Sequence, residues 1–326
     1  MIGLSNQPPV AGGGPVDAVG WERLGPWTAP DARPLTPRCR RADEVGVSSQ
    51  PLPVRRVRFA YPPDMDPAWI PGRPEFAHMA NGLSLLMPYA EPLFIKAVRS
   101  GMDELDDAQR ARAEDYIRQE VGHHRQHALF NEIIRARHPG VARVEGWMKR
   151  CADWVTRTRS RRYNLAFSAG GEIMSFLLAR WVDTHAGELF AGADPVATTL
   201  FLWHLSEEVE HKSMAFDVYE AVDGSKLRYA LAMVQGTALL GFFVWAAALV
   251  MLRDDGRLWR PMTHVRLARW AISAAFELFP AMLMSALPGH HPDDFTDPLY
   301  LTTLLAQYDP ETQTMPLWES PGRTAA

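Results

Sequence analysis

The stretch that decides the fold is HLSEEVEH, residues 204–211. It places His204, Glu208 and His211 at spacings of four and three residues. On an α-helix, at about 100° per residue, these three side chains fall within an arc of about 60°. They can therefore reach one point on the same side of a helix, which is the arrangement that a metal-ligand set requires.

A second Glu-x-x-His pair, Glu120 and His123, lies on an earlier helical segment. A dinuclear site in a four-helix bundle takes one such pair from each of two helices and a single Glu from each of the other two. Glu91 and Glu172 are glutamates inside apolar stretches, where a carboxylate is costly unless it is paired or bound to a metal. The order along the chain predicts these metal ligands: Glu91, Glu120, His123, Glu172, His204, Glu208 and His211.

Other polar residues on the same faces are expected to orient the ligands. His127 and Asn131 continue the face of His123, and Glu207 lies at the edge of the face of Glu208. We expect these three to act in a second shell around the metals, where they fix the ligand imidazoles. Glu210 points away from that face, toward solvent or an ion pair.

A third pair, Glu75 and His78, shows that a single Glu-x-x-His is weak evidence. This pair lies 16 residues before Glu91, about 160° around a helix, and so faces elsewhere. We interpret the pair as surface residues or as residues that cap the helix.

The chain is helical almost throughout after Pro74, with no run of alternating strands. Pro88 and Pro92 should kink or break the first helix near Glu91. The residues between 140 and 162 are interpreted as a linker. Four long helices with short connections predict an all-α fold, a ferritin-like four-helix bundle. Their expected ranges are 74–105, 106–139, 163–190 and 194–223.

An additional apolar helical hairpin is expected at residues 230–252 and 263–287. The first segment is long enough to span a bilayer, but we favour contact with a membrane surface or burial against the bundle over a true span. The expected organisation is an extended or disordered N-terminal arm (1–55), a di-metal bundle (56–225) and C-terminal apolar helices and tail packed on it (226–326).

The composition excludes several classes of protein. The chain has 326 residues, 47% hydrophobic and 22% charged, which is ordinary for a globular protein. A net charge of −4 lacks the basic surface that nucleic-acid-binding proteins have. Two cysteines cannot build a disulfide scaffold or a zinc ribbon. The N-terminus has no basic start and no apolar run, so we expect a cytoplasmic protein with membrane association through the apolar hairpin.

The ligand constellation resembles the ferritin-like di-iron carboxylate proteins. The spacing of His204, Glu208 and His211 resembles that of the p-aminobenzoate N-oxygenase family, in which a histidine is a seventh ligand. Residues 76–292 more specifically resemble a bacterial family of predicted metal-dependent hydrolases. The matching stretches are LSLLMP (83–88), Gln119 to Asn131, EEVEHK (207–212), AFDVY (215–219) and PGHHP (288–292). Ala90 stands where that family has a glycine.

The first functional hypothesis is a non-haem di-iron oxygenase with two Fe ions, O₂ as co-substrate and an external electron donor. The substrate would be a small or lipophilic organic molecule, with N-oxygenation of an amine as one example. Manganese or a mixed Fe/Mn pair is the alternative metal content. The alternative function is a metal-dependent hydrolase that uses a metal-bound hydroxide on an ester or phosphoester. Iron storage or a structural metal clip is a third interpretation, and a homodimer is compatible with all of them.

Overall fold

The computed structural model describes residues 51–319. Within that range the regular structure is helical, and the β-structure is limited to an isolated bridge between Asp309 and Thr314. The prediction of an all-α fold is confirmed. Most of the predicted N-terminal arm lies outside the described residues; the described part, 51–55, has no regular secondary structure.

The helices in chain order are α1 (Pro74–Gly101), α2 (Asp107–Arg137), α3 (Val141–Thr158), α4 (Arg161–Leu189), α5 (Pro195–His211), α6 (Met214–Val222), α7 (Lys226–Asp254), α8 (Pro261–Ser285) and α9 (Leu299–Leu305), with short 3-10 helices η1 (Met102–Glu104) and η2 (Pro292–Asp294). Local sequence sets several of these starts. The Asp106 side chain accepts from the Gln109 amide at 2.8 Å, and Asp194 accepts from the amides of Val196 and Ala197. Each aspartate satisfies amides that the first helical turn leaves without partners.

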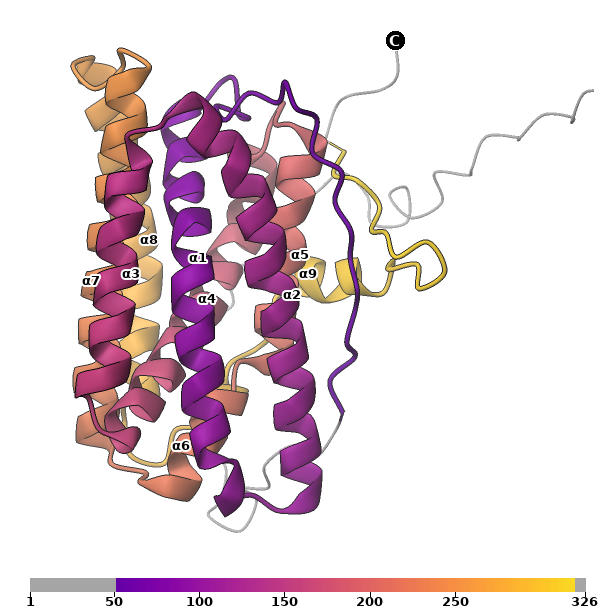
Figure 1. Cartoon of the computed structure of the whole chain (residues 1–326), viewed down its shortest axis with the longest axis vertical. Coiled ribbons are helices and arrows are strands. Elements are labelled where there is room, and N and C mark those ends of the chain that lie inside the picture. The colour runs from indigo at the N-terminus through magenta and orange to yellow at the C-terminus, as the bar shows by residue number, and fades with distance from the viewer. Residues whose placement is uncertain (1–50, 320–326) are drawn as a thin grey trace, which may run out of the picture.

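The four helices that carry the candidate ligands form a bundle: α1 packs on α2 and α4, while α5 packs on α4 and α2 (Figure 1). The apolar hairpin of α7 and α8 lies along one side of this bundle, where α7 contacts α1, α3 and α4. Within the described residues, three helices (α4, α7 and α8) are long and apolar enough to cross a membrane. Buried apolar residues from Leu52 to Trp318 form one contiguous cluster, so the core does not mark where one predicted region ends and the next begins. The division of the chain into three regions therefore stays a prediction.

The interpretation of residues 140–162 as a linker is wrong, because most of this segment is the helix α3. Its buried residues include Val141, Val144, Met148 and Val155, which recur at helical spacing and cover one face. The exposed Arg143, Arg150 and Arg157 lie on the other face of this helix.

The predicted fourth helix is not continuous, because it breaks directly after His211 into α5 and α6. Two outside contacts accompany the break. Arg112 donates to the Glu210 carbonyl at 3.4 Å, and the buried Lys212 donates to the Phe295 carbonyl at 3.2 Å. The break therefore lies where α2 and the segment after η2 reach this part of the chain.

Pro88 and Pro92 do not break α1, which runs through both residues. Pro88 has no N–H to donate to the Ser84 carbonyl four residues earlier, so that carbonyl loses its helical partner. The Asn131 side-chain amide of α2 donates to it at 2.9 Å instead. A neighbouring helix thus supplies the bond that the proline removes.

Of the two interpretations of Glu75 and His78, surface or capping residues, the surface interpretation is wrong, because both are buried. Glu75 accepts from Thr263 at 3.0 Å and pairs with Arg266, while His78 Nε2 lies 2.8 Å from Asp255 Oδ2. The partners belong to α8 and to the residue after α7. This pair therefore fastens one end of the hairpin to α1.

We predict that Asp183 makes stability depend on pH. Its side chain is 5% exposed and accepts from the Leu301 amide of α9 at 2.9 Å, and burial raises its pKa to about 6. A carboxyl with a raised pKa stabilises the fold in its protonated form, and this contribution is lost as pH rises through the folded pKa. Asp183→Asn keeps an acceptor without the charge. Its free energy of unfolding relative to wild type should rise by up to ~3 kcal/mol between about pH 4 and 7. Denaturant unfolding at several pH values measures this, and a difference that is flat with pH would contradict it.

Candidate metal centre

Six of the seven predicted ligands converge in two overlapping groups. Glu120, His123, Glu208 and His211 form one group, and Glu91, His123 and His204 form the other. Within each group the ligand atoms lie within 4.8 Å of one another, and all six residues are buried. They come from α1, α2 and α5.

One contact within the centre has hydrogen-bond length, His204 Nε2 to Glu208 Oε1 at 2.9 Å, whereas the other distances suit a shared ion better than direct hydrogen bonds. Glu120 Oε1 lies 3.4 Å from His211 Nε2 and 3.6 Å from His123 Nδ1. Glu91 Oε1 lies 3.6 Å from His204 Nε2. Separations of this size are too long for good hydrogen bonds but leave the atoms aimed at common points.

Two of the three imidazoles are held by a carboxylate at the nitrogen that faces away from the centre. His123 Nε2 lies 2.9 Å from Glu207 Oε2, and Arg55 donates to the other Glu207 oxygen at 3.4 Å. His211 Nδ1 lies 2.9 Å from Glu172 Oε2. A carboxylate only accepts, so each imidazole donates outward, and the neutral ring presents its inner lone pair to the centre. Against the effect of burial, the surrounding carboxylates raise the pKa of both His123 and His211, so a metal ion would take the place of the inner proton.

His204 is held by a longer relay. Asn131 donates its amide to the Ser84 carbonyl, so its Oδ1 accepts the Ser84 hydroxyl at 2.6 Å. The Ser84 oxygen then accepts from His127 Nδ1 at 2.8 Å, which leaves His127 Nε2 to accept from His204 Nδ1 at 2.7 Å. Burial lowers the pKa of His127 to about 3, so it stays neutral. His204 Nε2 therefore carries no hydrogen and acts as an acceptor. It lies 2.9 Å from Glu208 Oε1, whose raised pKa favours the protonated form that donates to it, and 3.6 Å from Glu91 Oε1.

Glu172, the remaining predicted ligand, lies beside the centre with both oxygens engaged. Oε1 accepts from the Tyr116 hydroxyl at 2.7 Å, and Oε2 accepts from His211. In this arrangement Glu172 orients His211. Its role as a direct ligand stays a prediction.

The centre is electrostatically strained without a cation. Burial raises the pKa of Glu91 and of Glu208 well above the usual range, and the charges of neighbouring carboxylates raise it further. The pKa of Glu120 is raised for the same reasons. Three buried carboxylates so close together cannot all ionise unless positive charge lies among them.

Orphaned polar atoms support a fit to metal ions. Among residues 51–319, both oxygens of Glu91, both of Glu120, Nδ1 of His123 and Nε2 of His211 are buried without a hydrogen-bond partner. Buried polar atoms normally have partners, so such a group needs an explanation. Three carboxylates and three imidazoles, four of which have inward atoms without a hydrogen-bond partner, suit a pair of divalent first-row metal ions.

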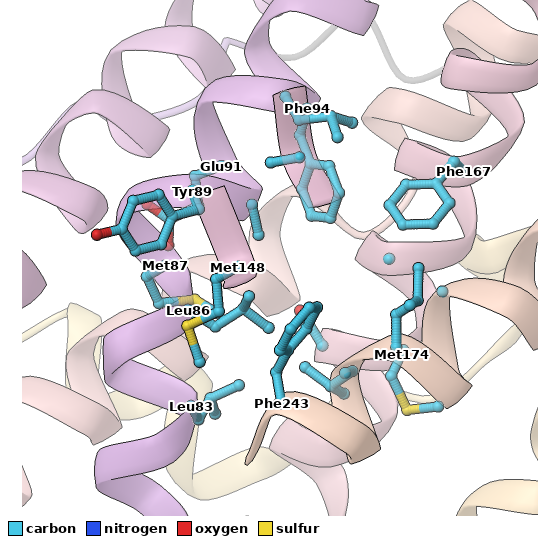
Figure 2. Close-up of a pocket in the computed structure, with 18 of the residues that line it drawn as sticks. Leu83, Leu86, Met87, Tyr89, Glu91, Phe94, Met148, Phe167, Met174 and Phe243 are labelled. Carbon is cyan, nitrogen blue, oxygen red and sulfur yellow. The ribbon is translucent and has the colours of Figure 1, made fainter. Parts of the chain in front are cut away.

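An apolar pocket opens onto this centre. Glu91, Glu120, His204 and Glu208 lie in its wall, and the rest of the lining is mostly aliphatic, aromatic and methionine side chains from α1, α3, α4, α5 and α7. Figure 2 shows Phe94 and Phe167 on one side of the pocket and Leu83 and Phe243 on another, with Glu91 beside Tyr89. The candidate metals would therefore face an apolar space rather than bulk water.

Three functional residues were missed from the sequence. Tyr116 lies four residues before Glu120 and Ser84 seven before Glu91, so helical spacing could have indicated both. Arg55, which also pairs with Glu210 at 2.8 Å, belongs to a segment without periodicity and gave no such signal.

We predict that Ser84→Ala weakens metal binding without removing a ligand. His127 would lose its acceptor, so the tautomer of His204 would no longer be fixed. Loss of such an outer contact typically weakens metal affinity by about 10- to 100-fold. Competition for Zn(II) against a chromophoric chelator measures the effect. Ser168→Ala is the matched control, because Ser168 is equally buried and outside the relay; equal affinities of the two variants would refute the relay.

The comparisons with known proteins agree with this site. No curated protein and no solved structure matches the chain. A family model described as "Predicted metal-dependent hydrolase" matches residues 53–295, which include every candidate ligand and the Ser84 relay. The chain therefore belongs to the family of predicted metal-dependent hydrolases.

Proposed function

We propose that the protein is a dinuclear metal-dependent hydrolase that cleaves an ester or phosphoester carrying an apolar group. The observation that carries this proposal is the position of buried carboxylate and imidazole donors in the wall of an apolar pocket. The family description supports hydrolysis over oxidation.

One set of residues would hold the ions, and a second set orients the imidazoles of the first. Glu91, Glu120, His123, His204, Glu208 and His211 would hold the two ions. When bound, such ions activate water and polarise the bond to be cleaved. Glu172, Glu207 and His127 fix the three imidazoles through their outer nitrogens. In the overall reaction water supplies the hydroxyl of the acid product and the hydrogen of the alcohol product.

The pocket would select the substrate. Its lining offers few polar groups other than the candidate ligands and Thr237, so it would bind a hydrocarbon portion and exclude bulk water. The reactive group of the substrate would lie against Glu91 and Glu208, where the pocket meets the metal centre.

Oxidation with O₂ is a second candidate, favoured by the donor set. The order Glu, Glu-x-x-His, Glu, Glu-x-x-His is the arrangement of dinuclear carboxylate sites in four-helix bundles. Glu172 does not complete that set in this structure, because Tyr116 and His211 engage both of its oxygens.

We predict that Glu120→Ala and Glu208→Ala each lower metal content from about two ions per chain to one or fewer. Hydrolysis of a p-nitrophenyl ester should fall to near background in both variants. Glu132→Ala, a change of the same type at a solvent-facing carboxylate of α2, should keep both properties. Elemental analysis and an absorbance assay provide the measurements. Full metal content with O₂ consumption but no hydrolysis of any ester would make oxidation the leading function.

We predict that Ala152→Phe shortens the chain that the pocket accepts. Ala152 lies in the lining on α3, so a ring there would occupy space that an alkyl chain needs. Hydrolysis of a p-nitrophenyl ester of a long-chain acid should fall at least tenfold, while the acetate ester is little affected. Ala142→Phe makes the same change on the exposed face of α3 and should change neither rate. An equal loss on both esters would show that the pocket does not select chain length.

A further inference from the structure

The hairpin of α7 and α8 presents apolar side chains to the outside of the molecule. Leu231, Val234 and Phe242 of α7 and Ile272, Phe276 and Phe279 of α8 are each more than half exposed. We call these six residues the outer stripe. At about 100° per residue, the α7 members fall within an arc of about 80° and the α8 members within about 60°. Each helix therefore has one apolar side that the bundle leaves uncovered.

Burial inside the bundle does not account for the apolar character of these helices. The most apolar stretch of α4 is 72% buried, as expected for a core helix. The corresponding stretches of α7 and α8 are only 28% and 17% buried, although their mean hydropathies of 1.8 and 1.3 exceed the 1.2 of α4. Exposed apolar surface of this extent marks an interaction site.

The groups at the turn of the hairpin point to a lipid surface as the occupant. Trp259 is 84% exposed between α7 and α8, and the exposed Arg253 and Arg260 flank it. Arg266 and Arg269 follow on the first three turns of α8; both are exposed, although Arg266 pairs with Glu75 and Arg269 with Glu188. Tryptophan and arginine at the border of an apolar face are typical of helices at the membrane interface, where the cations meet anionic headgroups.

The hairpin would lie on the bilayer rather than cross it. The other side of α7 packs along α1 and α4, and α8 packs on α4, over much of the length of the bundle (Figure 1). Insertion across a membrane would carry the polar surfaces of the bundle with it. Contact through the outer stripe alone buries only the uncovered side.

The same helix α7 forms a wall of the pocket. Gly236, Leu240 and Phe243 line the pocket, and they lie roughly opposite the outer stripe at about 170° around the helix axis. One helix therefore separates the apolar pocket from the surface that would touch lipid (Figure 2 shows Phe243 on the pocket side).

We propose that the outer stripe binds an anionic bilayer surface, and that the pocket takes the hydrocarbon chain of a lipid dissolved in that bilayer. The second part rests on the proposed function. The ester or phosphoester group would then meet the metal centre while its chain occupies the space between α3, α4 and α7.

Sedimentation with vesicles tests the membrane contact. The full chain should sediment with vesicles that contain phosphatidylglycerol and bind those of phosphatidylcholine alone several-fold less. Phe276→Glu/Phe279→Glu should reduce sedimentation at least tenfold. Leu129→Glu/Leu317→Glu, which changes two half-exposed leucines away from the hairpin, should leave it unchanged. Arg253→Gln/Arg260→Gln should remove the preference for anionic vesicles.

The alternatives give different results. A wild-type protein that stays in the supernatant would overturn the proposal. So would a dimer in light scattering that Phe276→Glu/Phe279→Glu converts to a monomer, because the stripe would then bind a second copy. Metal content and hydrolysis of the soluble acetate ester should be the same in the stripe variant as in wild type. A failure of the hydrolase proposal would thus appear in those assays, and a failure of the membrane proposal in sedimentation.

Discussion

The concentration of negative charge inside the bundle is the constraint on which the site depends. Glu91, Glu120 and Glu208 are buried within reach of three imidazoles, and several of their atoms lack partners among the described residues. Desolvation and the charges of the neighbouring carboxylates favour the protonated form of these carboxyls, as their raised pKa values indicate. Divalent ions would reverse that balance, because they supply the positive charge and occupy the free lone pairs. Metal binding would therefore be coupled to the stability of the bundle.

The surrounding residues fix the direction of every imidazole. Glu207 and Glu172 accept from His123 and His211, and the relay from Asn131 reaches His204. The relay also explains why α1 tolerates Pro88, since the same Asn131 amide that fixes the proton positions occupies the carbonyl that the proline leaves free. The Asn131 side chain therefore supports both the continuity of α1 and the orientation of His204.

The helices outside the bundle give the centre its apolar surroundings. α3 and α7 cover the pocket, and Glu75 and His78 fasten the hairpin of α7 and α8 to α1. The hairpin thereby connects two apolar environments, the pocket and the outer stripe. A metal centre shielded from water beside such a surface suits chemistry on lipophilic molecules.

The sequence by itself determined the all-α class, the positions of most long helices and the set of charged residues that face one another. This was possible because Glu-x-x-His spacing and apolar periodicity are local properties of a helix. Contacts between helices decided the rest. The linker interpretation failed because α3 packs on α1 and α7, and α7 lies far away in the sequence. Likewise, only packing shows that Glu172 contacts Tyr116 and His211, that Pro88 leaves α1 intact, and that Glu75 and His78 are buried. The sequence shows which residues can share a face, whereas the tertiary structure decides what each face meets.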